Sequence, residues 1–154
     1  METKNKELKI IGRIITTQEG KAICIDEKYR PGMEKVDFFS HIIVLWWAGN
    51  YKEESERTQL TYYPYYAEDI LTGVFACRSP IRPNPIGLTV CKIKNVNMNQ
   101  GIIHIDEIDA AAGTEILDIK TYFPVYDRVK EFRQPDWLPD YWGEWRYPVP
   151  EQGE

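Results

Sequence analysis

The chain is a succession of short runs of β-forming residues, each closed by turn residues. The run His41–Trp47 is too short for a typical helix and is rich in β formers, so it predicts a buried strand. Further runs of this kind are Ile10–Thr16, Lys21–Ile25, Gly73–Arg78, Leu88–Val96, Gly101–Ile108 and Glu115–Phe123. Short strands at this spacing favour a mainly β fold, a small closed or nearly closed β-barrel. The alternation of strands with long helices that a doubly wound fold needs is missing.

The segments between these runs carry turn residues and few helix signals. Gln18-Glu19-Gly20 predicts a hairpin turn, and Met33–Asp37 predicts one helical turn before the next strand. The charged stretch Tyr51–Thr58 is expected to be a solvated loop or a short helix. These connections supply the short helical turns of the predicted barrel.

A length of 154 residues suits one domain. We expect residues 1–128 to form the barrel and residues 129–154 to form a C-terminal arm rich in Trp and Pro. The aromatic side chains of this arm are Trp137, Trp142 and Trp145, and its prolines include Pro148 and Pro150. Such an arm is expected to pack without regular structure on the barrel or on a partner subunit.

The charge of the chain is unevenly distributed. The formal net charge is −5, which argues against a protein that is basic throughout and binds nucleic acid over its whole surface. From Ile70 to Ile105, however, there is no Asp or Glu, and the stretch holds Arg78, Arg82, Lys92 and Lys94. This local basic segment predicts a place where an anion docks.

Several classes of protein are not expected from the sequence. No apolar run reaches the roughly 18 residues of a membrane span, and Met1–Lys9 lacks the apolar centre of a signal peptide. The three cysteines are odd in number and widely spaced, as in a reduced cytoplasmic protein. His41 and His104 with scattered cysteines do not supply an evident metal site. We therefore expect a cytoplasmic protein that needs neither a metal nor a membrane.

The segment Gly73–Leu88 contains a loop stiffened by proline. Pro80, Pro83 and Pro85 fix their own backbone torsions and push the residues before them toward extended geometry. The loop is therefore expected to present polar side chains, among them Arg82 and Asn84, at low entropic cost. A rigid loop that carries such groups is typical of a preorganised site.

The whole run from Gly73 to Leu88 resembles the signature of the TsaA-like (TrmO) family. Further matching positions are Ile11-Gly12-Arg13-Ile14, Asp109-Ala110, Gly113-Thr114, Leu117-Asp118-Ile119-Lys120, Tyr122 and Asp127. The resemblance implies an enzyme, an S-adenosylmethionine-dependent methyltransferase with a small barrel core. It further implies N6-methylation of threonylcarbamoyl-adenosine beside the tRNA anticodon, a donor bound at the barrel core, and a homodimer.

The matching positions give the expected site. The candidate catalytic residues are Arg82, Asn84 and Asp118, and the candidate donor-binding residues are Phe75, Arg78, Ser79, Asp109, Thr114, Lys120 and Tyr122. A sulfonium favours an aromatic face and a carboxylate favours a cation, which suits Phe75 or Tyr122 and Arg78 or Lys120 respectively. A poor amine nucleophile gains from a positioned proton acceptor, and Asp109 and Asp118 are the carboxylates to test.

Structural alternatives remain open for several of these residues. Asp118 and Lys120 lie two apart on a predicted strand and hence on one face, where they can form a structural ion pair. Arg82 can instead clamp the proline loop to a neighbouring carbonyl. His41 can be a buried histidine with its bonds satisfied, and Cys77 a small core side chain.

The sequence also departs from the family pattern. Ala112 stands where an Asp is common, and Glu115 and Thr121 stand in place of prolines. Two other functions therefore remain beside tRNA methylation. One is a methyltransferase of a small metabolite, and the other is a non-enzymatic protein that binds S-adenosylmethionine.

Overall fold

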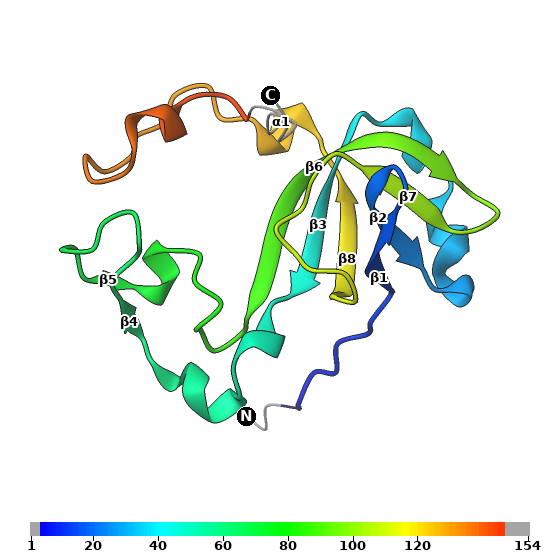
Figure 1. Ribbon diagram of the computed structural model, residues 1–154. Coiled ribbons are helices and arrows are strands. Elements are labelled where there is room, and N and C mark those ends of the chain that lie inside the picture. The colour runs from blue at the N-terminus through cyan, green and yellow to red at the C-terminus, as the bar shows by residue number, and fades with distance from the viewer. Residues whose placement is uncertain (1–3, 147–154) are drawn as a thin grey trace. The chain divides into compact units, whose positions relative to one another are not determined.

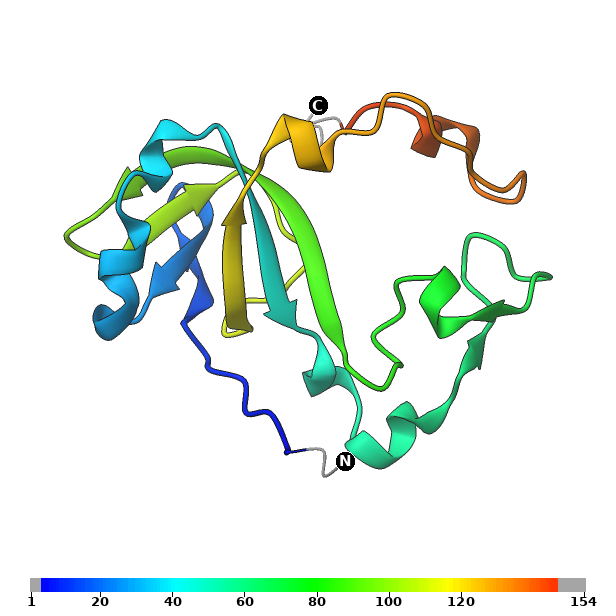
Figure 2. The ribbon, with the colours of Figure 1, turned by 180° about the vertical axis from the view of Figure 1, so that it is seen from behind.

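The computed structural model describes residues 4–146. Six antiparallel strands close into a barrel in the order β1-β2-β7-β6-β3-β8 (Figure 1). The strands are β1 (Gly12–Thr17), β2 (Gly20–Ile25), β3 (His41–Trp47), β6 (Ile86–Asn97), β7 (Ile102–Ile105) and β8 (Glu115–Thr121). The predicted mainly β fold with a small closed barrel is confirmed. Figure 2 shows the same barrel from behind, with the long green β6 running beside β3.

Side chains of alternate residues fill the barrel. In β3, Ile42, Val44 and Trp46 are buried, whereas the residues between them are only half-buried. The continuous apolar run predicted a buried strand; the strand is confirmed, and full burial is limited to one of its two faces. The interior is completed by fully buried β-branched residues of neighbouring strands, namely Ile14, Ile23, Ile103, Ile105 and Ile116. Each such side chain contributes about 1.5–3 kcal/mol when it is buried.

The predicted hairpin at the start of the chain is confirmed. β1 pairs with β2 from Gly12↔Ile25 to Thr17↔Gly20. Gly20 has φ +105°, a left-handed conformation that glycine adopts without strain. At the other end, Gly12 passes so close to its neighbour that a Cβ would overlap the Cys24 carbonyl oxygen. Glycine is therefore needed at both ends of this hairpin, for different reasons.

Short helical turns connect the strands of the barrel. The 3₁₀ turns η1 (Glu27–Met33) and η2 (Val36–Phe38) lie between β2 and β3, where one helical turn is predicted. They bury Met33 and Val36, and their charged residues are exposed except Arg30, which is half-buried. This pattern of burial fits a turn that covers the barrel core.

The chain divides into two compact units. The first unit contains residues up to Trp47 together with Leu88–Tyr122, and the second contains Ala48–Gly87 and the chain from Phe123 onward. In this division the segment between β3 and β6 belongs with the C-terminal part, and the expected domain boundary at residue 128 stays a prediction. The second unit holds β4 (Thr61–Tyr62), β5 (Thr72–Gly73), η3 (Gly49–Tyr51), η4 (Glu54–Thr58), η5 (Val74–Ala76), α1 (Pro124–Asp127) and η6 (Asp140–Gly143).

The expected strand over Gly73–Arg78 is wrong. Only Thr72–Gly73 pairs as a strand there, and the chain then turns into η5. Val74 and Cys77 are both buried, and their spacing of three residues places them on one side of a 3₁₀ turn. The Cys77 thiol donates to the Val74 carbonyl oxygen at 3.7 Å, and the Val74 amide donates to Leu60. Burial of these two side chains therefore selects the turn over the strand, and Cys77 is a core side chain as predicted.

Aromatic contacts join the C-terminal arm to the rest of the second unit. The Tyr66 and Trp142 rings lie 4.8 Å apart between centroids, in an edge-to-face arrangement. Trp142 also contacts Tyr141 edge-on. The expected packing of the arm on the barrel or on a partner subunit stays a prediction, and Pro148 and Pro150 lie outside the described residues.

Candidate functional site

The proline loop, Cys77–Pro85, is closed from within by Arg82. Its Nη1 donates to the carbonyl oxygens of Cys77 at 3.1 Å and of Ser79 at 3.2 Å. The Ile81 amide donates to the Ser79 hydroxyl at 3.1 Å, which forms a second small turn inside the loop. Both ends of the loop are buried, and the Pro85 carbonyl accepts a bond from the Ala48 amide. The clamp considered for Arg82 is therefore present, and its catalytic role stays a prediction.

The loop and the preceding turn direct three of the expected site residues to solvent. Phe75 is 82% exposed, and Arg78 and Asn84 are also exposed. Val74 and Cys77 hold the turn below them, so the exposed groups stand on a fixed backbone. An aromatic face, a guanidinium and an amide thus stand on one short segment of the second unit.

The surroundings of Arg78 include a cluster of tyrosines. Burial raises the pKa of Tyr66 above 10.0. Interactions with Cys77, Tyr65 and Tyr62 raise this pKa further, and the positive charge of Arg78 lowers it. Tyr66 is therefore a neutral phenol at physiological pH. Arg78 thus stands beside a neutral phenol, and its exposed guanidinium is a group that can bind an anion.

In the first unit, Asp118 and Lys120 point to the outer face of the barrel because β8 contains a bulge. Ile119 lies opposite buried Val44, and Ile116 lies opposite buried Trp46, with the register shifting between them. If Leu117 instead took a regular position in the ladder, strict alternation from Ile116 would turn Asp118 and Lys120 inward. The bulge is thus the feature that places both charges on the surface.

Asp118 and Lys120 form the ion pair that was considered as an alternative. Lys120 Nζ lies 2.7 Å from Asp118 Oδ2, and the side chains are 61% and 46% exposed. The hydrogen bond from Lys120 to Asp118, followed by the attraction of their charges, raises the pKa of Lys120. Asp118 Oδ1 also accepts a bond from the Ile119 amide at 2.9 Å. The carboxylate is therefore held in one orientation, which suits either a structural or a catalytic role.

Tyr122 follows at the end of the same strand. Its amide donates to the His41 carbonyl oxygen at 3.1 Å, and the two rings lie 6.2 Å apart. His41 is half-buried, and its Nδ1 lies 2.8 Å from the Ser40 hydroxyl. The alternative of a buried histidine with its bonds satisfied therefore holds only in part, because β3 begins at His41 and the residue lies on the half-buried face. Tyr122 and Lys120 thus occupy the same end of the outer face.

Asp109 and Thr114 lie at the opposite end of β8. Both belong to the β7–β8 loop, residues 106–114, where Asp109 is exposed and Thr114 is half-buried. Eight residues separate Thr114 from Tyr122, which is more than about 20 Å along a strand. The first unit therefore brings Asp118, Lys120 and Tyr122 together on one face, and it does not bring Asp109 and Thr114 to that end.

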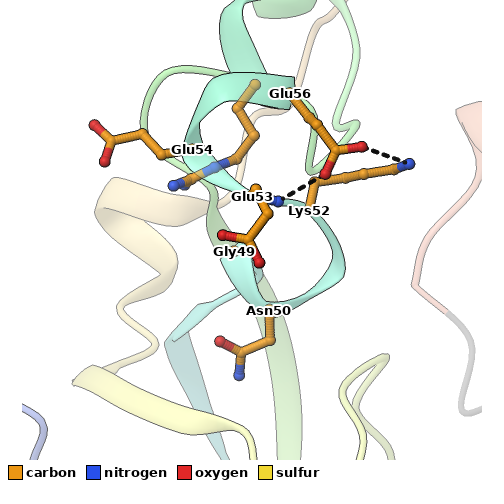
Figure 3. A pocket seen from close by; sticks show the side chains of 7 residues that line it. Gly49, Asn50, Lys52, Glu53, Glu54 and Glu56 are labelled. Carbon is orange, nitrogen blue, oxygen red and sulfur yellow. Dashed lines mark hydrogen bonds and ion pairs between the residues drawn. The ribbon is translucent and has the colours of Figure 1, made fainter.

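A polar cavity in the second unit contains none of the expected site residues. It measures about 450 Å³ and is lined by Gly49, Asn50, Lys52, Glu53, Glu54, Glu56 and Arg57 (Figure 3). Glu56 accepts bonds from the Glu53 amide at 3.0 Å and from Lys52 at 3.4 Å. These contacts lower the pKa of Glu56, and the hydrogen bond from the Glu53 amide has the largest effect. Three carboxylates with little apolar surface do not suit an adenosyl group.

The exposed side chains of the proline loop and of the preceding turn fit S-adenosylmethionine better than this polar cavity does. The aromatic ring of Phe75 suits a sulfonium, and Arg78 suits the carboxylate of a methionine moiety.

In the part of the chain that the structure describes, no cluster of three or more metal-ligating side chains occurs. Over the same residues, no helix is long and apolar enough to cross a membrane. The three cysteines carry thiols.

Three structural features of the site were not identified from the sequence. They are the β8 bulge, and Lys21 and Arg13, which bind the β7–β8 loop from β2 and β1 respectively. Lys21 lies 87 residues from its partner Ile108, and Arg13 lies 100 residues from Gly113. Contacts across such separations leave no periodic signal in a single sequence.

The fold and the motif segments define a barrel protein of the TsaA-like class. Residues 5–128 match the family model described as the tRNA-methyltransferase O N-terminal domain. The chain belongs to this family, so the predicted membership is confirmed. The family is one of methyltransferases, in agreement with the enzyme class that the resemblance implied.

Curated relatives agree with this membership. An Archaeoglobus fulgidus protein named S-adenosyl-L-methionine-binding protein is 38% identical over 109 residues, covering 71% of this chain and 73% of the relative. A Methanocaldococcus jannaschii protein named as a probable S-adenosyl-L-methionine-binding protein is 38% identical, covering 75% of this chain and 90% of the relative. The human tRNA (adenine(37)-N6)-methyltransferase is 47% identical over 64 residues, which is 42% of this chain and 14% of the human protein. The cofactor in the archaeal names is the one that the resemblance implied.

A solved structure supports the fold. TrmO from P. aeruginosa superposes with a TM-score of 0.66 at 22% identity, covering 88% of this chain. This chain spans 62% of the length of that protein. At this level of identity the similarity concerns the fold alone.

Proposed function

We propose that this protein transfers a methyl group from S-adenosylmethionine to N6 of an adenine in tRNA, with threonylcarbamoyl-adenosine beside the anticodon as the acceptor. The proline loop carries the proposal, because its geometry is what a preorganised site requires. Arg82 closes the loop with two bonds, and Phe75, Arg78 and Asn84 stand exposed around it. Family membership and the names of the relatives support the same chemistry.

Residues of the loop would hold the methyl donor. Arg78 is the cation for the donor carboxylate, Phe75 is the aromatic face, and the Ser79 hydroxyl still has a hydrogen to donate. When bound, S-adenosylmethionine supplies an electrophilic methyl group. The chain must then keep the acceptor nitrogen in line with that group, about 3–3.5 Å away, and a loop fixed at both buried ends meets this need.

A carboxylate is the group suited to remove the proton of the acceptor amine, and Asp118 is the candidate. Asp118 is held by the Ile119 amide and by Lys120, so its orientation is fixed before a substrate arrives. A carboxylate in this position accepts a hydrogen bond from the amine and then its proton. Asn84 is the alternative contact for the amine, because a side-chain amide oxygen accepts a hydrogen bond from an N–H group.

Phosphates of the RNA are expected to contact the basic segment. Arg78 and Lys92 are exposed, and no acidic residue interrupts the sequence between Ile70 and Ile105. Because the rest of the chain is acidic, contact with RNA is restricted to this segment. Affinity for tRNA should then fall steeply as salt rises. A tRNA acceptor also implies a cytoplasmic protein.

The proposal includes a homodimer. Of the nineteen large apolar side chains that are exposed among the described residues, fifteen belong to the second unit. Val125 and Tyr126 are 82% and 81% exposed, and Phe132 and Trp145 are 61% and 69% exposed. An apolar surface of this extent marks an interface, and a second copy of the chain is the partner that the resemblance implies.

Light scattering on the eluted protein tests the dimer. Val125→Asp should halve the measured mass, since it places a charge in the expected interface. Phe38→Asp is the matched control, because Phe38 is 77% exposed on the first unit. A wild-type monomer, or dissociation caused equally by both variants, would refute the assignment.

The decisive experiment is methylation of bulk tRNA from a strain that lacks this activity. Purified protein and isotope-labelled S-adenosylmethionine are incubated with the tRNA, and the nucleosides are analysed by mass spectrometry. Labelled N6-methyl threonylcarbamoyl-adenosine is the expected product. Donor binding without any labelled nucleoside would instead favour a small-metabolite acceptor or a binding protein, and absence of donor binding would refute the proposal.

A further inference from the structure

The β7–β8 loop, residues 106–114, is bonded to the barrel along much of its backbone. The Gly113 amide donates to Ile14 at 2.8 Å, and Arg13 Nη1 donates to the Gly113 carbonyl at 3.3 Å. At its start, the Cys91 thiol donates to the Glu107 carbonyl at 3.2 Å. A connection that only had to join two strands would not need so many tethers from other strands.

The centre of this loop is held by one side chain. Lys21, in β2, donates from its Nζ to the carbonyl oxygens of Ile108 and Ala110, at 2.8 Å each. The two carbonyls flank Asp109, whose own side chain is exposed. Ile108 and Ala110 are 1% and 2% exposed, so the backbone on each side of Asp109 is anchored by a buried side chain as well.

An ammonium group is suited to this task. It offers three donors on a flexible stem, so one lysine can satisfy two carbonyls that have no strand partner. Two bonds on either side of a residue fix the direction in which its side chain leaves the backbone. Lys21 therefore fixes the backbone from which the Asp109 side chain leaves the loop.

We propose that Lys21 is a positioning residue for the proposed methyl transfer, and that it acts by fixing Asp109 in the orientation used by the site. The inference rests on the proposed function and on the expectation from the sequence that Asp109 is a donor-binding residue, at the opposite end of β8 from Asp118. Lys21 itself touches neither donor nor acceptor in this assignment. Its effect on activity passes entirely through the β7–β8 loop.

Hydrogen exchange measured by mass spectrometry tests the positioning directly. Lys21→Met should raise the exchange of the loop amides between Asp109 and Gly113 by about tenfold, and Lys21→Arg should restore most of the protection. Lys35→Met is the matched control, because it removes a lysine that is 69% exposed and whose described side-chain contacts, with Glu34 and the Phe38 ring, lie outside the β7–β8 loop. Unchanged loop exchange in Lys21→Met would overturn the proposal.

Kinetics then separate positioning from simple stabilisation. Lys21→Met should lower kcat/KM about tenfold, a loss typical of misplaced groups. In an Asp109→Ala background the same substitution should have less than a twofold effect, since there is no carboxylate left to position. An equal loss in both backgrounds would overturn the proposal. If the wild-type protein neither binds the donor nor methylates tRNA, the proposed function fails, and the exchange measurement still decides whether Lys21 fixes the loop.

Discussion

Substitution of Arg82 tests whether the proline loop depends on its internal clamp. Arg82→Ala removes the two bonds from Nη1 to Cys77 and Ser79. A hydrogen bond from a charged donor is worth about 1.5–3 kcal/mol. Because one nitrogen makes both bonds and the side chain is only half-buried, we take about 1.5 kcal/mol for the pair. This free energy corresponds to about a tenfold rise in the open fraction of the loop.

Two measurements read out this change. Exchange of the Ile81 amide, which is bonded to Ser79 Oγ in the closed loop, should rise about tenfold in Arg82→Ala. Affinity for S-adenosylmethionine, measured by calorimetry, should fall by up to about the same factor, with little change in the thermal midpoint of the barrel. Arg82→Lys keeps a cation that can reach the carbonyls and should recover most of both properties.

Other outcomes would refute the clamp. Unchanged exchange at Ile81 in Arg82→Ala would show that the prolines alone hold the loop. If the affinity fell by more than about a hundredfold and Arg82→Lys gave no recovery, Arg82 would be contacting a ligand through its planar guanidinium, because lysine does not replace a bidentate arginine.

Three further substitutions have specific expected results. Gly12→Ala should destabilise the barrel by about 1–3 kcal/mol in urea unfolding, because its Cβ would overlap the Cys24 carbonyl. Gly32→Ala, which meets no atom within 4 Å, should change the midpoint little, and equal effects would contradict the packing argument. For Tyr66, whose pKa is raised above 10.0 by burial, the unfolded chain ionises first, so stability should fall as pH rises from about 10 toward the folded pKa. Tyr66→Phe should remove this part of the loss of stability at alkaline pH. If the pH dependence of stability were the same in the variant and the wild type, burial of Tyr66 would not contribute to that loss. Asp118→Asn should lower kcat while donor affinity stays within about threefold, and a loss confined to affinity would assign Asp118 to binding instead.

The strands of the barrel could be predicted because their signal is local. His41–Trp47 was predicted with the bounds that β3 has, since β-forming residues are uninterrupted there. The segment after Gly73 was predicted as a strand and is a 3₁₀ turn, because burial of Val74 and Cys77 on one side outweighs the β propensity of the run. Local preference is decisive only where the tertiary environment agrees with it.

The candidate site shows the same limit. The Gly73–Leu88 motif and the prolines predict a rigid loop, and the loop is closed and anchored at both ends. That one face of β8 carries Asp118 and Lys120 was also predictable from their spacing. Which face it is could not be predicted, because the bulge opposite Leu45 and Trp46 arises from pairing with β3.

The sequence by itself therefore determined the family, the mainly β class and the identity of the polar groups in the proline loop. These properties depend on residue type and on near neighbours, which a single chain displays directly. The tertiary structure decided the closure of the barrel, the outward direction of Asp118, and the bonds from Lys21 to the loop that carries Asp109. Each of these depends on strands distant in sequence, and their contacts form only when loop closure has brought the strands together.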